Sequence, residues 1–299
     1  MILRDKYVKL NANKLTKFSY TYKHRQSILT SSYILFTLHI LGGGMMMKKI
    51  ISVIMVLLVS LPLFSTHVLA KEGVGKESLV ALGDSIPYGY NLEKNNQHPS
   101  RDAYPYLIGD KANLRVRNLG EPGWTTEDLL ASIQGDQKYR QAIRHSDYIT
   151  LSIGSNDLLR GFRQEATQAK VMELVFNGDY SVYEEVQDIM DVPDLVDRME
   201  TIISEIRALS DSPIVFYNIY NPYPSSDFQN HMIGSLLLHD FAGGFNSIIT
   251  SEIDDEKNVV VVDAYEAMIG EDSNLIPGDI HPTELGQERL AEIGYEVLR

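Results

Sequence analysis

The chain has 299 residues, a formal net charge of −13 and no cysteine. The lack of cysteine excludes disulfide bonds and a cysteine-linked lipid anchor. The acidic charge disfavours nucleic acid and bare anionic membrane as partners. This charge is stronger in residues 71–299, because the first 70 residues contain nine Lys or Arg and a single Asp.

Residues 45–70 predict a secretory signal peptide. A short basic start at Met47–Lys49 precedes the apolar run Ile50–Phe64, and small or branched residues at 68–70 precede Lys71. This order is typical of an export signal, here with cleavage after Ala70. The apolar run is shorter than the roughly 20 residues that span a bilayer, so we expect no stable membrane anchor.

Residues 1–44 precede this signal, although an export signal begins at or near the amino terminus. The stretch GGGMMMKK suggests why, because glycine codons begin with GG and the message before Met45–Met47 would resemble a bacterial ribosome-binding site. We interpret residues 1–44 as an upstream extension that is not part of the natural product. The mature protein would be residues 71–299, one exported domain without cysteine, which suits a Gram-positive bacterium.

Short apolar runs alternate with segments of helical period along residues 71–299, which predicts βαβ units and a parallel sheet. We expect strands at 78–82, 115–119, 148–153, 213–220 and 259–263, and helices at 104–112, 127–133, 182–210 with a break near Pro193, 233–253 and 284–297. The acidic stretch 164–210 is interpreted as an insertion near the carboxyl edge of the sheet, with its apolar positions in the core. The fold class is α/β, a three-layer α/β/α domain.

Four polar motifs stand at the ends of these elements. GDS (83–85), NLGEPGWTT (118–126) and IGSNDLL (153–159) follow predicted strands, and GDIHPTELG (278–286) precedes the last helix. Each motif alone could be a turn or a helix cap. Together they indicate a site, because the carboxyl ends of parallel strands meet where α/β sheets bind ligands.

The four motifs can supply the groups that acyl transfer requires. Ser85 would be the nucleophile, His281 the general base and then the general acid, and Asp279 the carboxylate that orients His281. The backbone N–H groups of Ser85 and Gly123 and the side-chain amide of Asn156 would form the oxyanion hole. Gly123 suits this position because the lack of a Cβ lets a substrate approach the backbone.

These motifs resemble those of the SGNH, or GDSL, hydrolases. Gly83–Ser85, Gly123, Gly154–Asp157 and His281–Pro282 match four of the family's blocks in order, over essentially all of residues 71–299. The resemblance implies a flavodoxin-like, five-stranded parallel sheet of order 2-1-3-4-5, no cofactor, and hydrolysis of esters or thioesters. The stretch IYNPYP (219–224) additionally resembles an exported Gram-positive branch of lipase/acylhydrolases.

The sequence departs from the family pattern at the orienting carboxylate. The family places an aspartate three residues before the histidine, and that position is Gly278 here, with Asp279 only two residues before. A kink at Gly278 would let Asp279 reach the imidazole. The alternative is a backbone carbonyl that orients the ring. Asp84 and Asp157 are interpreted as scaffold residues.

We therefore expect a secreted serine esterase or lipase that acts on a small-molecule or lipid acyl ester. One alternative is an O-acetylesterase that acts on carbohydrate or cell wall. Another is an inactive acyl- or glycan-binding module. The complete set of Ser85, Asn156 and His281 argues against the inactive module. No metal is expected, since the other mature histidines lack ligand spacing. Candidate pocket walls are Tyr88, Trp124, Leu158, Leu159, Phe162, Tyr220 and Tyr223.

Overall fold

A computed structural model describes residues 75–177, 183–239, 244–253 and 258–298. The predicted upstream extension, the predicted signal peptide and residues 71–74 lie outside the described residues. Within the described part of the chain, none of the helices is both long enough and apolar enough to cross a membrane.

The sheet has five parallel strands in the order β2-β1-β3-β4-β5, which confirms the predicted topology. The strands are β1 (Ser78–Gly83), β2 (Arg115–Gly120), β3 (Tyr148–Ser152), β4 (Ile214–Tyr217) and β5 (Val259–Val262). β1, which carries the GDS motif, lies next to β2 and β3 inside the sheet. The carboxyl ends of all five strands therefore meet at one edge.

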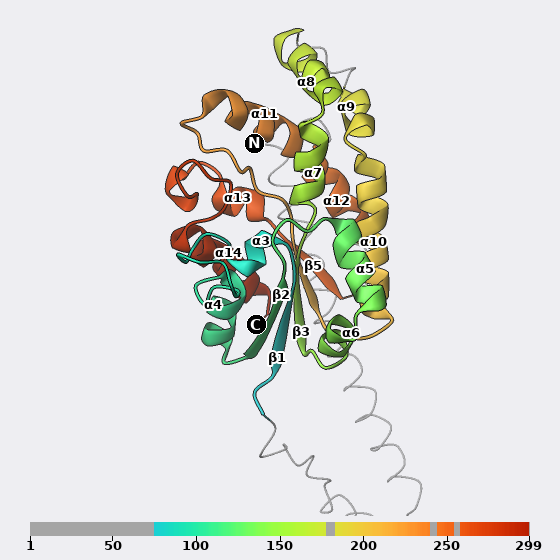
Figure 1. The fold of residues 1–299 in the computed structure, drawn as a ribbon, viewed down its shortest axis with the longest axis vertical. Coiled ribbons are helices and arrows are strands. Elements are labelled where there is room, and N and C mark those ends of the chain that lie inside the picture. The colour runs from blue at the N-terminus through green and yellow to red at the C-terminus, as the bar shows by residue number, and fades with distance from the viewer. Residues whose placement is uncertain (1–74, 178–182, 240–243, 254–257, 299) are drawn as a thin grey trace, which may run out of the picture. The chain divides into compact units, whose positions relative to one another are not determined.

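Helices cover both faces of this sheet (Figure 1). In chain order the helices are α3 (Ser85–Tyr88), α4 (Tyr104–Ala112), α5 (Thr126–Gly135), α6 (Gln137–Arg144), α7 (Ser155–Phe162), α8 (Glu165–Asn177), α9 (Tyr183–Ile189), α10 (Val192–Arg207), α11 (Phe228–Leu238), α12 (Phe245–Ile253), α13 (Ala264–Met268) and α14 (Glu284–Val297), with a 3₁₀ turn η4 (Asp272–Asn274) before α14. α4 and α14 lie on one face, and α5, α6 and α10 lie on the other. The predicted three-layer α/β/α class is confirmed.

Side chains alternate between two cores because successive residues of a strand point to opposite faces. Along β1, Leu79 packs in the core beneath α4 and α14, while Val80 and Leu82 pack in the core beneath α5, α6 and α10. All three are at most 2% exposed. A strand buried on both faces reads as a continuous apolar run, which is why β1 could be predicted without alternation.

The strand predicted at 213–220 is shorter in the structure, where β4 ends at Tyr217. Two residues later the buried Asn246 of α12 takes over the hydrogen bonding of Ile219. Its Oδ1 accepts from the Ile219 N–H at 2.9 Å, and its Nδ2 donates to the Ile219 carbonyl at 2.7 Å. A side chain thus replaces the sheet partner, and the chain turns away from the sheet.

Two predicted helices are each divided in the structure. The helix expected at 233–253 is replaced by α11 and α12, because the backbone at His239 is extended and Gly244, just before α12, disfavours a helix. The segment 182–210 forms α9 and α10, and the break falls at Asp191, whose φ is 59°. Pro193 lies in the first turn of α10, where proline is tolerated. Val182 lies outside the described residues.

The acidic segment after residue 164 forms α8, α9 and α10. In Figure 1, α8 and α9 lie beyond the carboxyl ends of the strands, and α10 runs down along one face of the sheet. The apolar positions of α10 are buried, with Met199, Ile202 and Ile206 fully enclosed. The predicted use of these positions in the core is therefore confirmed.

Candidate active site

Ser85 stands at the turn between β1 and α3. The strand ends at Gly83, and Asp84 caps α3 by accepting a hydrogen bond from the Ile86 N–H at 2.9 Å. Ser85 is the first residue of α3, so its N–H is one of those that a helix leaves without an intrahelical acceptor. The cap thus presents both the hydroxyl and the N–H of Ser85 at the edge of the sheet.

The imidazole of His281 connects Ser85 to Asp279. His281 Nε2 lies 3.0 Å from Ser85 Oγ, and His281 Nδ1 lies 2.6 Å from Asp279 Oδ1. In neutral histidine, the Nδ1–H would donate to the carboxylate and Nε2 would accept from the hydroxyl. This arrangement can accept the proton of the serine hydroxyl when the oxygen attacks an electrophile.

A tight turn places Asp279 and His281 on the same side of the loop before α14. The Asp279 N–H donates to the Ile276 carbonyl at 2.9 Å, and the Ile276 N–H donates to the His281 carbonyl at 2.9 Å. Gly278 has φ of 76°, which favours glycine. This kink lets an aspartate two residues before the histidine reach Nδ1. Among the described residues, no backbone carbonyl takes that place.

Asn91 holds the other oxygen of the Asp279 carboxylate. Its Nδ2 donates to Asp279 Oδ2 at 2.6 Å, while the Ile280 N–H donates to Oδ1. Burial opposes ionisation of Asp279, but the hydrogen bonds from Asn91 and His281 keep its pKa below the ordinary value. The carboxylate therefore stays ionised beside the imidazole. Sequence reasoning missed Asn91, since 188 positions separate it from Asp279 and no spacing links them.

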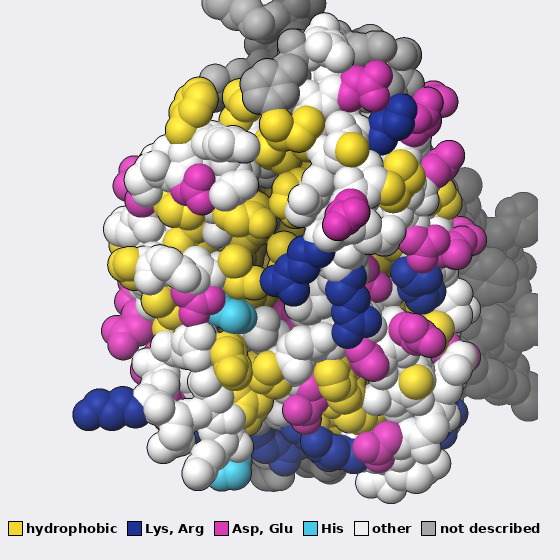
Figure 2. Space-filling model, turned by 45° about the horizontal axis from the view of Figure 1, so that its top comes forward, with side chains coloured by type: hydrophobic (Ala, Val, Ile, Leu, Met, Phe, Trp, Pro, Cys, Tyr) yellow, Lys and Arg dark blue, Asp and Glu magenta, His cyan; other side chains and the backbone are white. Residues whose placement is uncertain are grey.

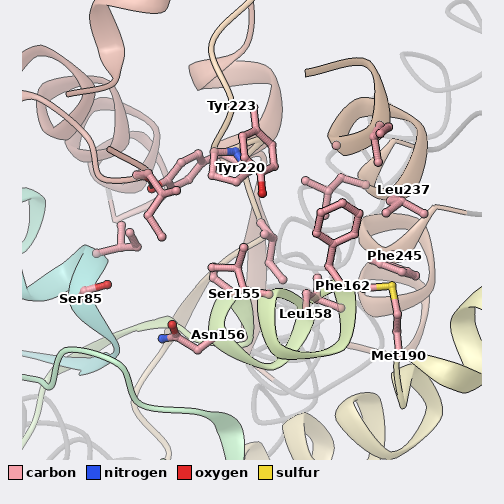
Figure 3. Close-up of a pocket in the computed structure, with 18 residues that line it drawn as sticks. Ser85, Ser155, Asn156, Leu158, Phe162, Met190, Tyr220, Tyr223, Leu237 and Phe245 are labelled. Atoms are coloured by element: carbon pink, nitrogen blue, oxygen red, sulfur yellow. Dashed lines mark hydrogen bonds between the residues drawn. The ribbon is translucent and has the colours of Figure 1, made fainter. Parts of the chain in front are cut away.

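The three predicted oxyanion donors come from three different strand ends. Gly123 has φ of 80° and would meet no atom within 4 Å of an added Cβ, so a ligand can approach its backbone closely. Asn156 Nδ2 donates one hydrogen to the Trp124 carbonyl at 2.8 Å, which leaves its second hydrogen available. Figure 3 shows Ser85 and Asn156 at the same end of a pocket.

Asp157 of α7 binds the start of α5, which directly follows the loop that contains Gly123. Its carboxylate accepts from the Thr126 N–H at 3.0 Å and from the Thr126 hydroxyl at 2.7 Å. Arg198 of α10 lies 3.5 Å from the same carboxylate and donates to the Thr126 hydroxyl at 2.8 Å. These bonds match the scaffold role expected of Asp157.

The pocket beside Ser85 is lined mainly by apolar side chains. Five of the candidate wall residues line it, namely Leu158, Leu159, Phe162, Tyr220 and Tyr223. Figure 2 shows hydrophobic side chains around a hollow above the carboxyl ends of the strands. The pocket is continuous with Ser85 and so offers a place for part of a ligand.

Tyr88 and Trp124 lie outside this pocket. The Tyr88 hydroxyl donates to the Asn96 carbonyl at 2.7 Å, and this side chain at the end of α3 is buried. The Trp124 indole stacks on Tyr139 with the ring centroids 5.6 Å apart. Both side chains anchor loops, because their aromatic rings find partners within the scaffold.

Two of the other histidines have contacts that are not those of a metal ligand. His231 Nδ1 lies 2.8 Å from the Tyr223 carbonyl, and His239 Nε2 lies 3.8 Å from Glu266. Across the described ranges, no group of three or more His, Cys, Asp or Glu side chains is arranged to hold a metal ion.

Asp84 is a buried acid directly beside Ser85. Its Oδ1 caps α3, but its Oδ2 is buried without a hydrogen-bond partner among the described residues. Burial raises the pKa of Asp84 to about 7. The charge of Asp157 also raises this pKa, whereas the hydrogen bond from the Ile86 N–H lowers it. Ionised Asp84 therefore costs stability in the folded state.

Asp84→Asn should have a higher free energy of unfolding than the wild type, and the difference should grow as the pH rises. The pKa of the Asp84 carboxyl is higher in the folded protein than its value of 3.8 in the unfolded chain. Ionisation of this carboxyl therefore lowers the stability of the wild type between about pH 4 and pH 7. The loss is on the order of 4 kcal/mol at most. Asparagine can still cap α3 but does not ionise. Urea unfolding of both proteins from pH 4 to pH 8.5 should show a growing difference in favour of Asn.

Asp128→Asn provides a control with the opposite sign. The hydrogen bonds from Thr125 lower the pKa of Asp128, so its carboxylate stabilises the fold above about pH 4. This variant should lose stability at neutral pH, and the loss should shrink in acid. A pH-independent difference between Asp84→Asn and wild type would contradict the buried-acid interpretation.

Known proteins share both the sequence pattern and the fold. Residues 81–289 match the GDSL-like Lipase/Acylhydrolase family. YpmR of Bacillus subtilis is 27% identical over 238 residues, which cover 77% of this chain and 85% of YpmR. Thioesterase 1/protease 1/lysophospholipase L1 of Escherichia coli K12 is 26% identical over 117 residues, 38% of this chain and 51% of that protein.

The fold is also similar to that of a solved lipase from a goat rumen metagenome. The TM-score is 0.52 at 21% sequence identity, and the match covers 73% of this chain and 98% of the lipase. Since the family match spans well over half of the sequence, the chain belongs to the GDSL-like lipase/acylhydrolase family and is an ester hydrolase.

Proposed function

We propose that the protein is an exported serine hydrolase that cleaves carboxylic esters through a covalent acyl-enzyme on Ser85. The observation that carries this proposal is the hydrogen-bonded chain from Ser85 Oγ through His281 to Asp279 Oδ1, with distances of 3.0 Å and 2.6 Å. Such a chain activates a serine hydroxyl, which is a weak nucleophile on its own.

In the first half of the reaction, Ser85 Oγ attacks the ester carbonyl carbon and His281 Nε2 takes the hydroxyl proton. Asp279 orients the imidazole and stabilises its positive charge. The N–H groups of Ser85 and Gly123 and the Asn156 amide donate to the oxyanion. When the tetrahedral intermediate collapses, the C–O bond to the alcohol breaks, and His281 returns the proton to the leaving alcohol.

The second half repeats these steps with water as the nucleophile. His281 removes a proton from water, which attacks the acyl carbon bound to Ser85 Oγ. The same three donors stabilise the second oxyanion. When this intermediate collapses, the bond between the acyl carbon and Ser85 Oγ breaks and His281 returns its proton to Ser85 Oγ. The carboxylic acid leaves, and the Ser85 hydroxyl and the neutral His281 are restored without a cofactor.

Ser85→Ala should lower kcat for nitrophenyl esters by at least about a thousandfold, because no covalent intermediate can form. The fold should persist, since the Ile86 cap depends on Asp84 rather than on the serine hydroxyl. Circular dichroism and initial rates on butyrate ester measure both effects. Ser251→Ala, which removes an exposed hydroxyl of α12, is the matched control. Substantial activity in Ser85→Ala would rule out Ser85 as the nucleophile.

Asp279→Asn should reduce kcat by between about tenfold and ten-thousandfold with little change in KM. The amide keeps the shape of the side chain but removes the charge and can select the wrong imidazole tautomer. Steady-state kinetics separate the two parameters, with the exposed Asp110→Asn on α4 as the control. A loss below tenfold, or an effect confined to KM, would mean that Asp279 does not orient His281.

The export part of the proposal is supported by the sequence of residues 45–70. Expressed in a Gram-positive host, the protein should accumulate in the medium with Lys71 as its first residue. Leu57→Arg, which places a charge in the apolar run, should keep it in the cell. Amino-terminal sequencing of that retained product should begin at Met45, Met46 or Met47. Residues from before Met45, or wild-type protein that stays inside the cell, would contradict these assignments.

A further inference from the structure

The pocket runs from Ser85 away from the catalytic residues. The space between its walls, counted together with the open solvent at its mouth, is about 670 Å³. In Figure 3, Ser85 and Asn156 lie at one end, while Leu237, Phe245 and Met190 lie at the other, with Leu158 and Phe162 nearer to that far end. A group attached to Ser85 Oγ could therefore extend along the pocket.

The chemistry of the walls changes along this length. Ser85, Ser155 and Asn156 are polar and lie on the side of the reaction, whereas the far end consists of hydrocarbon and a thioether. Of the lining residues that the structure describes, none carries a charged side chain. The Tyr220 hydroxyl is already bound to the Ile280 carbonyl at 2.7 Å. A sugar would leave its hydroxyls unpaired along such walls, but an aliphatic chain would not.

Hydrogen bonds hold the walls in place. The buried Asn221 donates to the His231 carbonyl at 2.9 Å and to the Ser235 hydroxyl at 3.0 Å, which fixes the segment after β4 against α11. Asn246 holds Ile219 from α12 in the same way. The pocket is thus largely formed before a ligand arrives, which reduces the entropy lost on binding.

We propose that this pocket binds the acyl moiety of the substrate as an extended, unbranched aliphatic chain, and that Leu237, Phe245 and Met190 set the longest chain that fits. The proposal rests on Ser85 being the acylated residue. The carbonyl carbon lies at the polar end, and the methyl end points toward α12. All three far-end side chains are at most 4% exposed and line the pocket, so a chain that reaches them meets buried apolar surface.

A series of nitrophenyl esters from acetyl to hexadecanoyl, kept below micellar concentrations, tests this assignment. For the wild type, kcat/KM should rise about fourfold for each added methylene, the value expected from burial of a CH₂ group. The rise should stop at the length that reaches the far end. A flat profile from acetyl to octanoyl would overturn the proposal.

Leu237→Trp should fill the far end and stop the rise at a shorter chain. We expect the ratio of kcat/KM for dodecanoyl to that for acetyl ester to fall at least tenfold relative to wild type. Leu236→Trp is the matched control, because Leu236 is the neighbouring residue of α11, packs against the core and does not line the pocket. It should leave the ratio unchanged. An unchanged ratio in Leu237→Trp would overturn the assignment.

Phe245→Ala gives a second variant with the opposite expectation, in case the tryptophan disturbs folding. Enlarging the far end should move the maximum of the series to longer chains. An unmoved maximum would exclude Phe245 as a determinant. Failure here is distinguishable from failure of the proposed function: a wild type that hydrolyses short esters but has no chain-length preference, and is inactive as Ser85→Ala, keeps the mechanism and loses only the acyl pocket.

Discussion

The hydrogen bond between His281 Nε2 and Ser85 Oγ is the contact on which the site depends. It joins residues that are 196 positions apart, one at the end of the first described strand and one in the last loop. Its 3.0 Å length requires that β1 and the loop before α14 be fixed relative to each other. The two cores of the sheet provide this rigidity, because close-packed interiors resist small displacements.

Further hydrogen bonds hold the segment around Ser85 and the segment around His281 in place relative to each other. Gln287 of α14 donates to the Ile86 carbonyl at 3.1 Å and accepts from the Tyr104 N–H at 2.8 Å, so the helix after His281 is bound to the helix that begins at Ser85. Asn91 reaches from the Ser85 side to Asp279. Several hydrogen bonds from different motifs thus position the His281 imidazole together. Such support matters because catalysis requires precise placement of the reacting groups.

The fold could be predicted from local patterns because its strands are continuous apolar runs and its motifs follow their ends. The sheet order came from the resemblance to a known family, since hydrogen-bonded neighbours such as β1 and β3 are not apparent from spacing. Element boundaries were less predictable: β4 ends early because Asn246, from a distant helix, binds Ile219.

The structure brings Ser85, His281 and Asp279 together, and a kink at Gly278 makes the unusual spacing possible. What the sequence did not indicate are contacts between distant segments. Asn91 carries no local signal, and Met190 and Phe245 come from separate helical regions that meet only in three dimensions. Trp124 follows Gly123 directly, yet its indole packs on Tyr139, because a side chain need not face the group that the neighbouring backbone N–H faces.

The role of Ser85 as nucleophile is tested most directly by locating a covalent adduct. The protein is treated with an alkyl fluorophosphonate until ester hydrolysis stops, and the digested product is then sequenced by mass spectrometry. We expect one phosphonyl group per chain, attached to Ser85, and loss of activity in proportion to labelling. Complete inactivation with the adduct on another residue, or full labelling of Ser85 with activity retained, would contradict this role.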